Sequence, residues 1–298
     1  MSNQPSVPEM TVVCCVDRNY LELAGVMLRS LEVNGDIPEA QLVVCGFDLV
    51  AADEVLLARC VSRPIRFVRL DAHQKSRLAS LPVRRQLTYV TYARLLLADI
   101  LADRNGRLLY LDSDMVINGS FRAIFDVDLQ GHALGAVPDL APKFAPWRNR
   151  CLGRPVEAPY FNAGMQLIDL QPWRARNFGA QAISYAEENP EIVDWLDQDA
   201  LNVVVGSDWS ALPASWNWCT GGNSPGEFTS ARIIHFTEQP KPNHVDCSHP
   251  AKQLFSRHRR DTPWRNSPLY PSQAKVRPRV LAGIGAKIAA LKDLIFRR

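Results

Sequence analysis

Three Asp-x-Asp triplets stand out in the sequence, because two carboxylates at this spacing can bind a divalent cation. The triplets are Asp112-Ser113-Asp114, Asp126-Val127-Asp128 and Asp197-Gln198-Asp199. Only the first directly follows a strand-like apolar run, LLYL. Side chains two residues apart on an extended chain point to the same side, so Asp112 and Asp114 could hold a cation against a diphosphate. A strand-ending turn is the alternative for this pair, whereas Asp126 and Asp128 are expected in a solvated loop or a helix cap.

A histidine and a lysine further along the chain could complete such a site. His235 ends the apolar run RIIH, and an imidazole beside two carboxylates favours Mn²⁺ over Mg²⁺. Lys241 follows six residues later and could neutralise phosphate oxygens. Each is weak alone, because a single His is more often structural and an exposed Lys usually has no role. The sequence contains neither GxGxxG nor GxxxxGK[ST], so a diphosphate would be bound mainly by metal and cationic side chains, as in nucleotide-sugar or nucleotidyl chemistry.

The elements that must position these residues alternate between strand and helix over the first 140 residues. Apolar runs predict strands over residues 11–17, 41–47, 65–70 and 107–111. Helical spacing predicts helices over residues 20–31, 52–61 and 91–102. Later patterns predict a strand over 163–170, a helix over 172–188, a helix beginning at Asp197 and a strand over 232–236. Such alternation predicts an α/β fold with a mostly parallel sheet, helices on both faces and ligands beyond the carboxyl ends of the strands.

Composition narrows the class of protein. The chain has 298 residues, of which 47% are hydrophobic and 22% are charged, as in globular proteins. Its seven cysteines form no CxxC pair, so we expect buried free thiols in a reducing compartment. We expect neither a signal peptide nor a membrane-spanning helix, since no uncharged apolar run approaches about 18 residues.

The basic residues are concentrated at the end of the chain. The net charge is +3, but residues 275–298 alone carry seven Lys or Arg and one Asp, which leaves a mildly acidic remainder that is a poor nucleic-acid binder. In the same segment Leu281, Ile284, Ile288, Leu291 and Ile295 recur at helical spacing. A basic amphipathic helix of this kind is typical of one that lies on an anionic membrane surface. Packing of the stripe on the protein's own body is the alternative, and a coiled coil is less favoured because the repeat is short.

Several sequence blocks together resemble the family-8 retaining glycosyltransferases, especially the bacterial lipopolysaccharide hexosyltransferases. In order over about residues 11–243 they are VDRNY, TYARLLL, LLYLDSD, YFNAGMQLIDL with WLDQDALN, and HFTEQPKP. The resemblance implies a GT-A type nucleotide-sugar transferase fold with a catalytic domain over residues 1–245. A helical extension with the basic tail would follow over residues 246–298. It also implies a UDP-hexose donor and Mn²⁺, with Mg²⁺ as an alternative.

The resemblance assigns roles to individual residues. For the nucleotide and the diphosphate it implies uridine contacts by Asp17 and Asn19, stacking of Tyr20 on uracil, and diphosphate contacts by Arg94 and Lys241. For the metal it implies ligation by Asp112, Asp114 and His235. For the donor sugar it implies contacts by Arg94, Asp139 and Asn162, and places Asp197, Gln198 and Asp199 beside the anomeric carbon.

Two residues depart from the family pattern in its last block. Glu238 replaces a Gly whose amide normally faces phosphate, and Asn243 replaces a Trp. Glu238 would place a negative charge near the diphosphate, which bears on the geometry of this loop and on donor affinity.

The expected reaction is hexose transfer with retention, which gives an α linkage from an α-linked donor. Of the carboxylates in the family blocks, Asp199 and Asp139 would be the candidate nucleophiles of a double displacement, but front-face attack supported by Gln198 is favoured. The acceptor is expected to be a lipopolysaccharide or another glycan- or lipid-linked molecule, met in the cytoplasm at the inner face of the cell membrane. The alternatives are a sugar-1-phosphate nucleotidyltransferase and a non-catalytic nucleotide-sugar binding protein, the latter because of Glu238.

Overall fold

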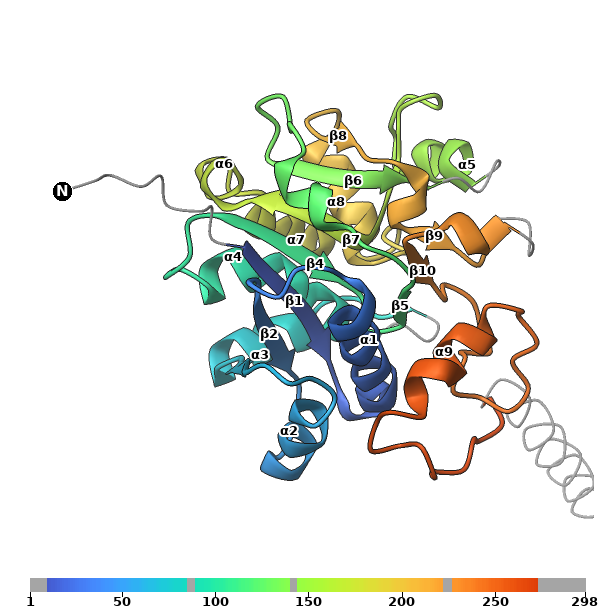
Figure 1. The fold of residues 1–298 in the computed structure, drawn as a ribbon. Helices are drawn as coiled ribbons and strands as arrows, with labels where there is room; N and C mark the ends of the chain where they lie inside the picture. Colours follow the sequence, from blue (N-terminus) through green and yellow to red (C-terminus); the bar gives the residue numbers. More distant parts are fainter. Residues whose placement is uncertain (1–9, 85–88, 140–143, 222–226, 273–298) are drawn as a thin grey trace, which may run out of the picture.

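A seven-stranded sheet forms the centre of the computed structural model, which describes residues 10–84, 89–139, 144–221 and 227–272 (Figure 1). The strand order is β3-β2-β1-β4-β7-β6-β8. The strands are β1 Met10–Val16, β2 Gln41–Gly46, β3 Ile65–Arg69, β4 Arg107–Leu111, β6 Leu134–Pro138, β7 Phe161–Asp169 and β8 Ser210–Ala211. Parallel ladders join β3, β2, β1 and β4, and β8 is parallel to β6. Only β7 runs against its two neighbours, so the prediction of a mostly parallel sheet is confirmed.

Helices cover both faces of this sheet. The α-helices of the described residues are α1 Leu21–Asn34, α2 Ala51–Ala58, α3 Ala72–Ala79, α4 Leu97–Ile100, α5 Phe144–Cys151, α6 Leu170–Ala175, α7 Phe178–Glu188, α8 Asp197–Val205 and α9 Lys252–Arg259. The alternation of side chains along β1 divides the core in two. Val12 and Cys14 lie in one buried cluster with residues of α1, whereas Val13 and Cys15 lie in the other, with residues of the 3₁₀ segment Tyr89–Leu96, α7 and α8. Burial on both faces explains why residues 12–16 of β1 are an uninterrupted apolar run.

A small second sheet meets the first at the end of β4. It has the order β5-β10-β9, with β5 Met115–Ile117, β9 Trp218–Cys219 and β10 Ile233–His235. Only residues 112–114 separate β4 from β5. In the antiparallel ladder His235 pairs with Met115, and the Phe236 N–H donates to the Asp114 carbonyl at 3.0 Å. This register brings the end of β10 next to the first Asp-x-Asp triplet.

Two of the predicted helices differ in detail. The segment predicted as one helix over 91–102 is a 3₁₀ helix, Tyr89–Leu96, followed by the short α4. The Thr91 carbonyl accepts from Arg94 Nε at 3.0 Å, so a side chain takes part in the hydrogen bonding of this first turn. The helix predicted over 172–188 is divided into α6 and α7 by Asn177, whose φ of 52° lies in the left-handed region that Asn tolerates better than most residues.

The C-terminal part of the described chain packs on the body of the protein. Arg259 in α9 pairs with Glu22 in α1, and Phe255 lies in a buried cluster with Leu23 and Val26. The boundary at residue 245 stays a prediction, and the basic segment 275–298 lies outside the described residues. The seven cysteines are free, as predicted, although Cys151 is exposed and Cys219 is half-buried.

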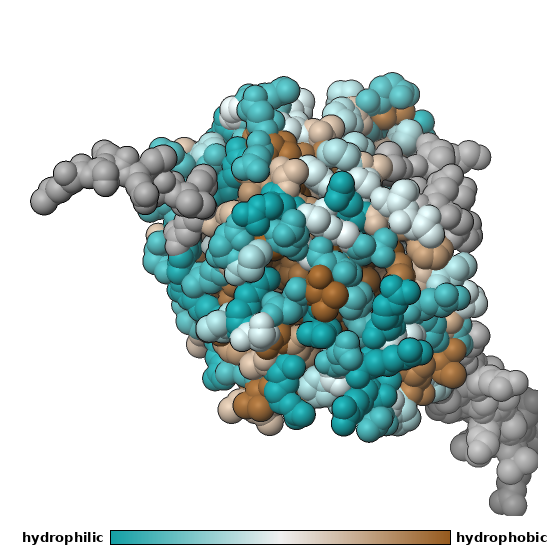
Figure 2. Space-filling view, viewed as in Figure 1, coloured by the Kyte–Doolittle hydropathy of each residue, from teal (hydrophilic) through white to brown (hydrophobic). Residues whose placement is uncertain are grey.

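No helix in the described ranges is both long and apolar enough to cross a membrane. On the face shown in Figure 2, hydrophilic side chains predominate and hydrophobic ones form scattered spots.

Close packing at Gly179 leads to a first prediction. A Cβ atom on this residue of α7 would lie 2.1 Å from the carbonyl oxygen of Leu95, in the 3₁₀ segment that carries Arg94. We expect Gly179→Ala to lower the free energy of unfolding by about 1–3 kcal/mol, because backbone must move to admit the methyl group. Chemical denaturation measures the loss.

Gly119→Ala is the matched control for this prediction. The nearest atom to a Cβ on Gly119 is Arg232 Cγ at 4.0 Å, so its stability should stay within about 0.5 kcal/mol of wild type. Equal stability of the two variants would contradict the packing described for α7.

Candidate active site

A cavity of about 420 Å³ opens where the central sheet meets the small sheet, at the carboxyl ends of β1 and β4. Most of the residues predicted for the site line it: Asp17, Tyr20, Arg94, Asp112, Asp114, Asp139, Asn162, Asp197, Gln198, His235 and Lys241. The topology of the sheet therefore gathers residues that are more than 200 positions apart in sequence. The two predicted residues that do not line the cavity are Asn19 and Asp199.

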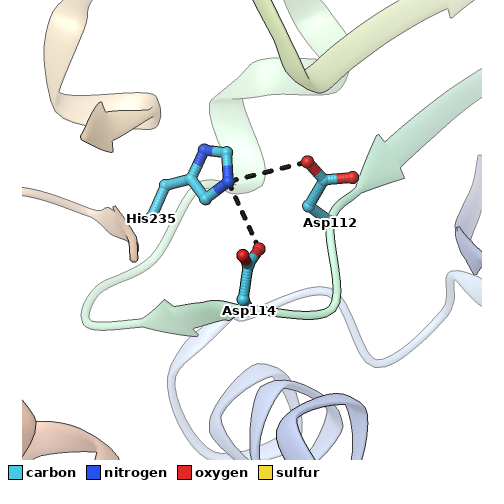
Figure 3. Close-up of side chains that lie close together, drawn as sticks. All are labelled: Asp112, Asp114 and His235. Atoms are coloured by element: carbon cyan, nitrogen blue, oxygen red, sulfur yellow. Dashed lines mark ion pairs between the residues drawn. The ribbon is translucent and has the colours of Figure 1, made fainter. Parts of the chain in front are cut away.

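Asp112, Asp114 and His235 form a cluster that could hold a metal ion (Figure 3). Their potential ligand atoms all lie within 4.8 Å of one another. His235 Nε2 is 3.2 Å from Asp114 Oδ1 and 3.6 Å from Asp112 Oδ2. Two carboxylates and one imidazole form a donor set that suits a divalent transition metal. The cluster therefore fits the metal site expected from the sequence.

A glycine of β7 makes room for this cluster. A Cβ on Gly164 would lie 2.3 Å from His235 Cε1 and 2.8 Å from Asp112 Oδ2. Any larger residue would displace two of the three potential ligands.

Lys241 adds a positive charge at the edge of the cluster. Its Nζ is 2.8 Å from Asp114 Oδ2, and both side chains are about nine-tenths buried. Burial alone would raise the pKa of Asp114, but attraction to Lys241 and His235 outweighs burial and holds this pKa well below its usual range. Burial would likewise lower the pKa of His235, but the Asp114 carboxylate outweighs it and raises the pKa to about 10.

Arg94 connects the metal cluster to the second acidic triplet. Its Nη2 is 3.0 Å from Asp112 Oδ1, and its Nε is 2.9 Å from Asp197 Oδ2. The buried guanidinium also lies 4.5 Å from the centre of the Tyr110 ring. Burial raises the pKa of Asp197 to about 6 despite the opposing attraction of Arg94. Arg94 is therefore a fixed charge between two carboxylates that face the same cavity.

Gln198 and Asn202 dock α8 on β7. Gln198 Oε1 accepts from the Ala163 N–H at 2.9 Å, and its Nε2 donates to the Tyr160 hydroxyl at 3.4 Å. One turn later Asn202 accepts from the Phe161 N–H and donates to the Phe161 carbonyl. These bonds fix the Gln198 amide at the cavity wall.

Asp199, expected beside the reaction centre, points elsewhere, and the structure corrects this expectation. Its side chain is fully buried and accepts from Arg148 Nε and Nη2, the Tyr160 hydroxyl and the Trp195 N–H at 2.5–3.1 Å. Successive residues of an α-helix are about 100° apart, so Gln198 can face the cavity while its neighbour faces Arg148. Asp199 is part of a buried ion pair.

The residues expected at the nucleotide lie in the turn after β1. Asp17 Oδ1 accepts from the N–H groups of Asn19 and Tyr20 at 2.9 and 3.1 Å. Tyr20 lines the cavity, whereas the Asn19 side chain is exposed outside it. Arg18 of the same turn pairs with Asp53 of α2 at 3.1 Å.

Sequence reasoning did not find Asn217, which links two of the predicted residues. Its buried side chain donates to Asn162 Oδ1 at 2.8 Å and contacts His235 Nδ1 at 3.0 Å. It lies in an irregular stretch between two tryptophans, where no spacing distinguishes it from an ordinary loop residue. Glu238, one of the departures, also lines the cavity and packs over Gly221.

Comparisons with known proteins agree with this architecture. Residues 11–247 match the family model described as Glycosyl transferase family 8. The chain is 28% identical to lipopolysaccharide 1,3-galactosyltransferase of Salmonella typhimurium, over 85% of this chain and 79% of that protein. It is 26% identical to general stress protein A of Bacillus subtilis, over 86% and 94%.

A solved structure shows the same fold. The crystal structure of the galactosyltransferase LgtC with donor and acceptor sugar analogues superposes with a TM-score of 0.75 at 24% identity. The match covers 86% of this chain and 99% of that one. The fold is the GT-A type, as predicted.

The contacts of Asp199 generate a second prediction. We expect Asp199→Asn to lower the free energy of unfolding by about 3 kcal/mol, because it leaves the Arg148 charge buried with little compensation. Thermal and chemical denaturation measure the change.

Asp208→Asn provides the comparison for a surface pair. Asp208 pairs with Arg176 at 3.0 Å, but both side chains are about one-third exposed, so the loss should be at most about 1 kcal/mol. An Asp199→Asn variant as stable as Asp208→Asn, with turnover abolished, would restore Asp199 as a catalytic residue.

Proposed function

The chain belongs to glycosyl transferase family 8, and from this premise we propose that it is a retaining hexosyltransferase that uses a UDP-sugar, UDP-glucose or UDP-galactose. The acceptor is a lipopolysaccharide or another glycan- or lipid-linked molecule, and the product linkage is α. The observation that carries the proposal is the joint placement of Asp112, Asp114, His235 and Lys241 in one cavity. Membership of the family sets aside the nucleotidyltransferase alternative.

Mn²⁺ is the proposed cation, with Mg²⁺ as an alternative, because an imidazole stands beside two carboxylates. Asp112, Asp114 and His235 hold it, and when bound it supplies Lewis-acid stabilisation of the departing UDP. Lys241 adds a positive charge at the diphosphate, where negative charge grows as the glycosidic bond breaks.

The turn after β1 binds the uridine in this proposal. Asp17 holds the turn through its two N–H contacts, and Tyr20 then offers its ring to the uracil from the cavity wall. Asn19 contacts uridine only where the nucleotide extends beyond the cavity lining. Arg94, held between Asp112 and Asp197, is the proposed contact to the diphosphate and the donor sugar.

The sugar lies against Asn162, Asp139 and Gln198. In front-face attack, the bond from the anomeric carbon to the UDP oxygen breaks and the acceptor oxygen bonds to the same face. The acceptor proton passes to the departing phosphate oxygen. The Gln198 carbonyl oxygen has a second lone pair beyond the one used by Ala163, and it stabilises the oxocarbenium-like centre. Asp139 is the candidate nucleophile for a double displacement, since Asp199 is held by Arg148 away from the cavity.

A donor panel tests the proposal. UDP-glucose, UDP-galactose and other UDP-sugars are offered with and without Mn²⁺, and free UDP is measured without an acceptor. We expect hydrolysis of one UDP-hexose that EDTA abolishes. Asp114→Ala should show at least a hundredfold lower turnover at saturating donor with an unchanged circular dichroism spectrum, because a metal ligand is lost.

Three results would contradict this proposal. Near wild-type turnover of Asp114→Ala would remove the metal assignment. A β linkage in the first-formed product, seen by NMR, would exclude retention. Tight binding of UDP-hexose with no hydrolysis and no transfer to any glycan would favour a binding protein, with the Glu238 carboxylate at the cavity as the reason.

Residues 275–298 are the proposed membrane contact. They lie outside the described residues, so the proposal rests on the sequence alone: seven basic residues accompany the Leu and Ile stripe. Each basic residue near an anionic surface contributes about 1 kcal/mol of binding. In this proposal the protein works in the cytoplasm, at the inner face of the cell membrane, where a lipid-linked acceptor is available.

Deletion of residues 275–298 tests this contact. We expect the shortened protein to lose co-sedimentation with anionic liposomes, while Mn²⁺-dependent UDP-sugar hydrolysis is unchanged. Zwitterionic liposomes serve as the control for charge. If the shortened protein unfolds or loses hydrolysis, the segment belongs to the core of the protein and the membrane proposal is wrong.

A further inference from the structure

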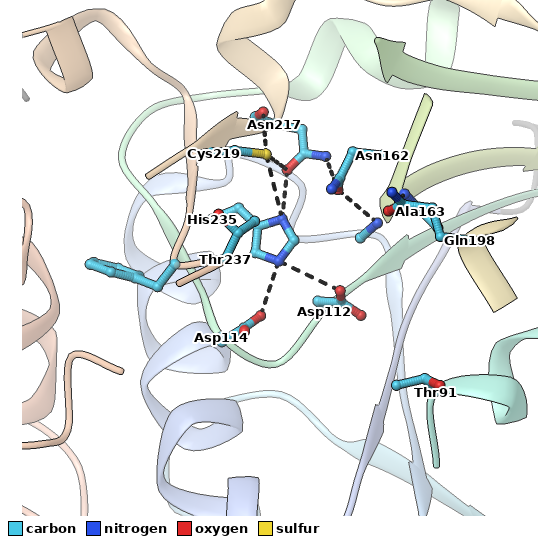
Figure 4. A network of polar contacts seen from close by, with 12 residues as sticks. Thr91, Asp112, Asp114, Asn162, Ala163, Gln198, Asn217, Cys219, His235 and Thr237 are labelled. Carbon is cyan, nitrogen blue, oxygen red and sulfur yellow. Dashed lines mark hydrogen bonds and ion pairs between the residues drawn. The ribbon is translucent and has the colours of Figure 1, made fainter. Parts of the chain in front are cut away.

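Asn217 lies between His235 and Asn162, both of which line the cavity (Figure 4). It follows the 3₁₀ helix Ala214–Trp216 and precedes β9, and its side chain is 2% exposed. One end of its amide is 3.0 Å from Nδ1 of the potential metal ligand His235. The other end is 2.8 Å from Oδ1 of Asn162, a residue of β7 that lines the cavity. A single buried amide therefore joins a potential metal ligand to a residue of β7 that lines the cavity.

The hydrogen bonds that run from His235 through Asn217 to Asn162 have one consistent assignment of donors and acceptors. Ligation of a cation by His235 Nε2 leaves the ring proton on Nδ1, which must then donate. Asn217 Oδ1 is the acceptor at 3.0 Å. The Asn217 amide nitrogen is thereby turned to Asn162, where it donates to Oδ1.

The same assignment fixes the donor and acceptor groups of Asn162 at the cavity wall. Asn162 Oδ1 receives a second hydrogen bond, from the Gly164 N–H at 3.0 Å. Since a carbonyl oxygen has two lone pairs, both are used by protein donors. The amide NH₂ is the part of Asn162 that remains to donate to a ligand in the cavity.

We propose that Asn217 is a positioning residue that fixes His235 for metal binding and, through the same amide, presents Asn162 as a hydrogen-bond donor to the donor sugar. The inference has two parts, which we call its metal end, the positioning of His235, and its sugar end, the presentation of Asn162 to the donor sugar. The sugar end rests on the proposed function, whereas the metal end does not. A chain of two amides thus couples the cation to recognition of the sugar. Cys219 also approaches His235 Nδ1, but at 4.0 Å it is a weaker partner than the Asn217 oxygen.

Two substitutions of Asn217 test its hydrogen bonds to His235 and to Asn162 separately. Asn217→Leu has a similar volume and removes both hydrogen bonds. Asn217→Asp keeps an acceptor for His235 Nδ1 but cannot donate to Asn162 Oδ1. Asn118→Leu is the matched control, because Asn118 donates to the Ala231 carbonyl at 2.9 Å outside the cavity.

Mn²⁺ binding in the absence of any nucleotide tests the metal end. Free Mn²⁺ is measured by electron paramagnetic resonance during titration of each folded variant. We expect Asn217→Leu to raise the Mn²⁺ dissociation constant by roughly 10- to 100-fold, the usual effect of losing the partner of a ligating His. Asn118→Leu should bind Mn²⁺ as wild type does, and Asn217→Asp at least as tightly, because a carboxylate accepts from Nδ1 and raises the basicity of His235.

Calorimetry with UDP and with the preferred UDP-hexose, both at saturating Mn²⁺, tests the sugar end. The ratio of the two affinities isolates the contact with the sugar. We expect Asn217→Asp to reduce this ratio by roughly fivefold to tenfold, as for the loss of one hydrogen bond, while UDP affinity is unchanged.

The outcomes distinguish this inference from the proposed function. Wild-type Mn²⁺ affinity in folded Asn217→Leu, or Mn²⁺ binding as weak in Asn217→Asp as in Asn217→Leu, would overturn the metal end. An unchanged affinity ratio in Asn217→Asp would overturn the sugar end. A wild-type protein that binds Mn²⁺ but no UDP-sugar would overturn the proposed function and the sugar end, while the metal results would still stand.

Discussion

The balance of charge in one cavity is the constraint on which the rest of the structure depends. Asp112, Asp114 and Asp197 converge there, and Asp114 and Asp197 are more than nine-tenths buried. Carboxylates in such a site repel one another and lose hydration, so each needs a cation close by. Arg94 lies between Asp112 and Asp197, while Lys241 and His235 share Asp114. The architecture can be understood as the means of holding these cations in place.

Separate elements supply the counter-charges, and each is positioned by contacts distant in sequence. Arg94 comes from a 3₁₀ segment pressed on α7, where Gly179 allows close approach to the Leu95 carbonyl. His235 comes from a short strand whose register with β5 is fixed by pairing with Met115. Gly164 of β7 leaves the space that the His235 ring occupies. A substitution that disturbs any of these contacts should therefore shift a cationic side chain away from its carboxylate in the cavity.

The sequence predicted the parts of this arrangement that depend on local pattern. Strand ends and the first Asp-x-Asp triplet indicated the ligand-binding edge of the sheet, whereas His235 and Lys241 were weak signals alone and were assigned through the family resemblance. The partners of Asn217 lie 18 and 55 residues away, and Asp199 meets Arg148 across 51 residues. Such contacts depend on tertiary packing and leave no periodic trace. The family resemblance placed Asp199 beside the anomeric carbon together with Asp197 and Gln198, whereas the rotation along α8 turns the Asp199 side chain to Arg148 and away from the cavity lining.

The charge balance also bears on the order of events at the site. Lys241 is 2.8 Å from Asp114, so a diphosphate that attracts Lys241 weakens the compensation of that carboxylate. A divalent cation among Asp112, Asp114 and His235 restores it, and a positive centre there in turn favours the diphosphate. Binding of either one should therefore strengthen binding of the other, and by linkage the two effects are equal. In the role proposed for Asn217, the two hydrogen bonds of its amide would extend this coupling from His235 to Asn162.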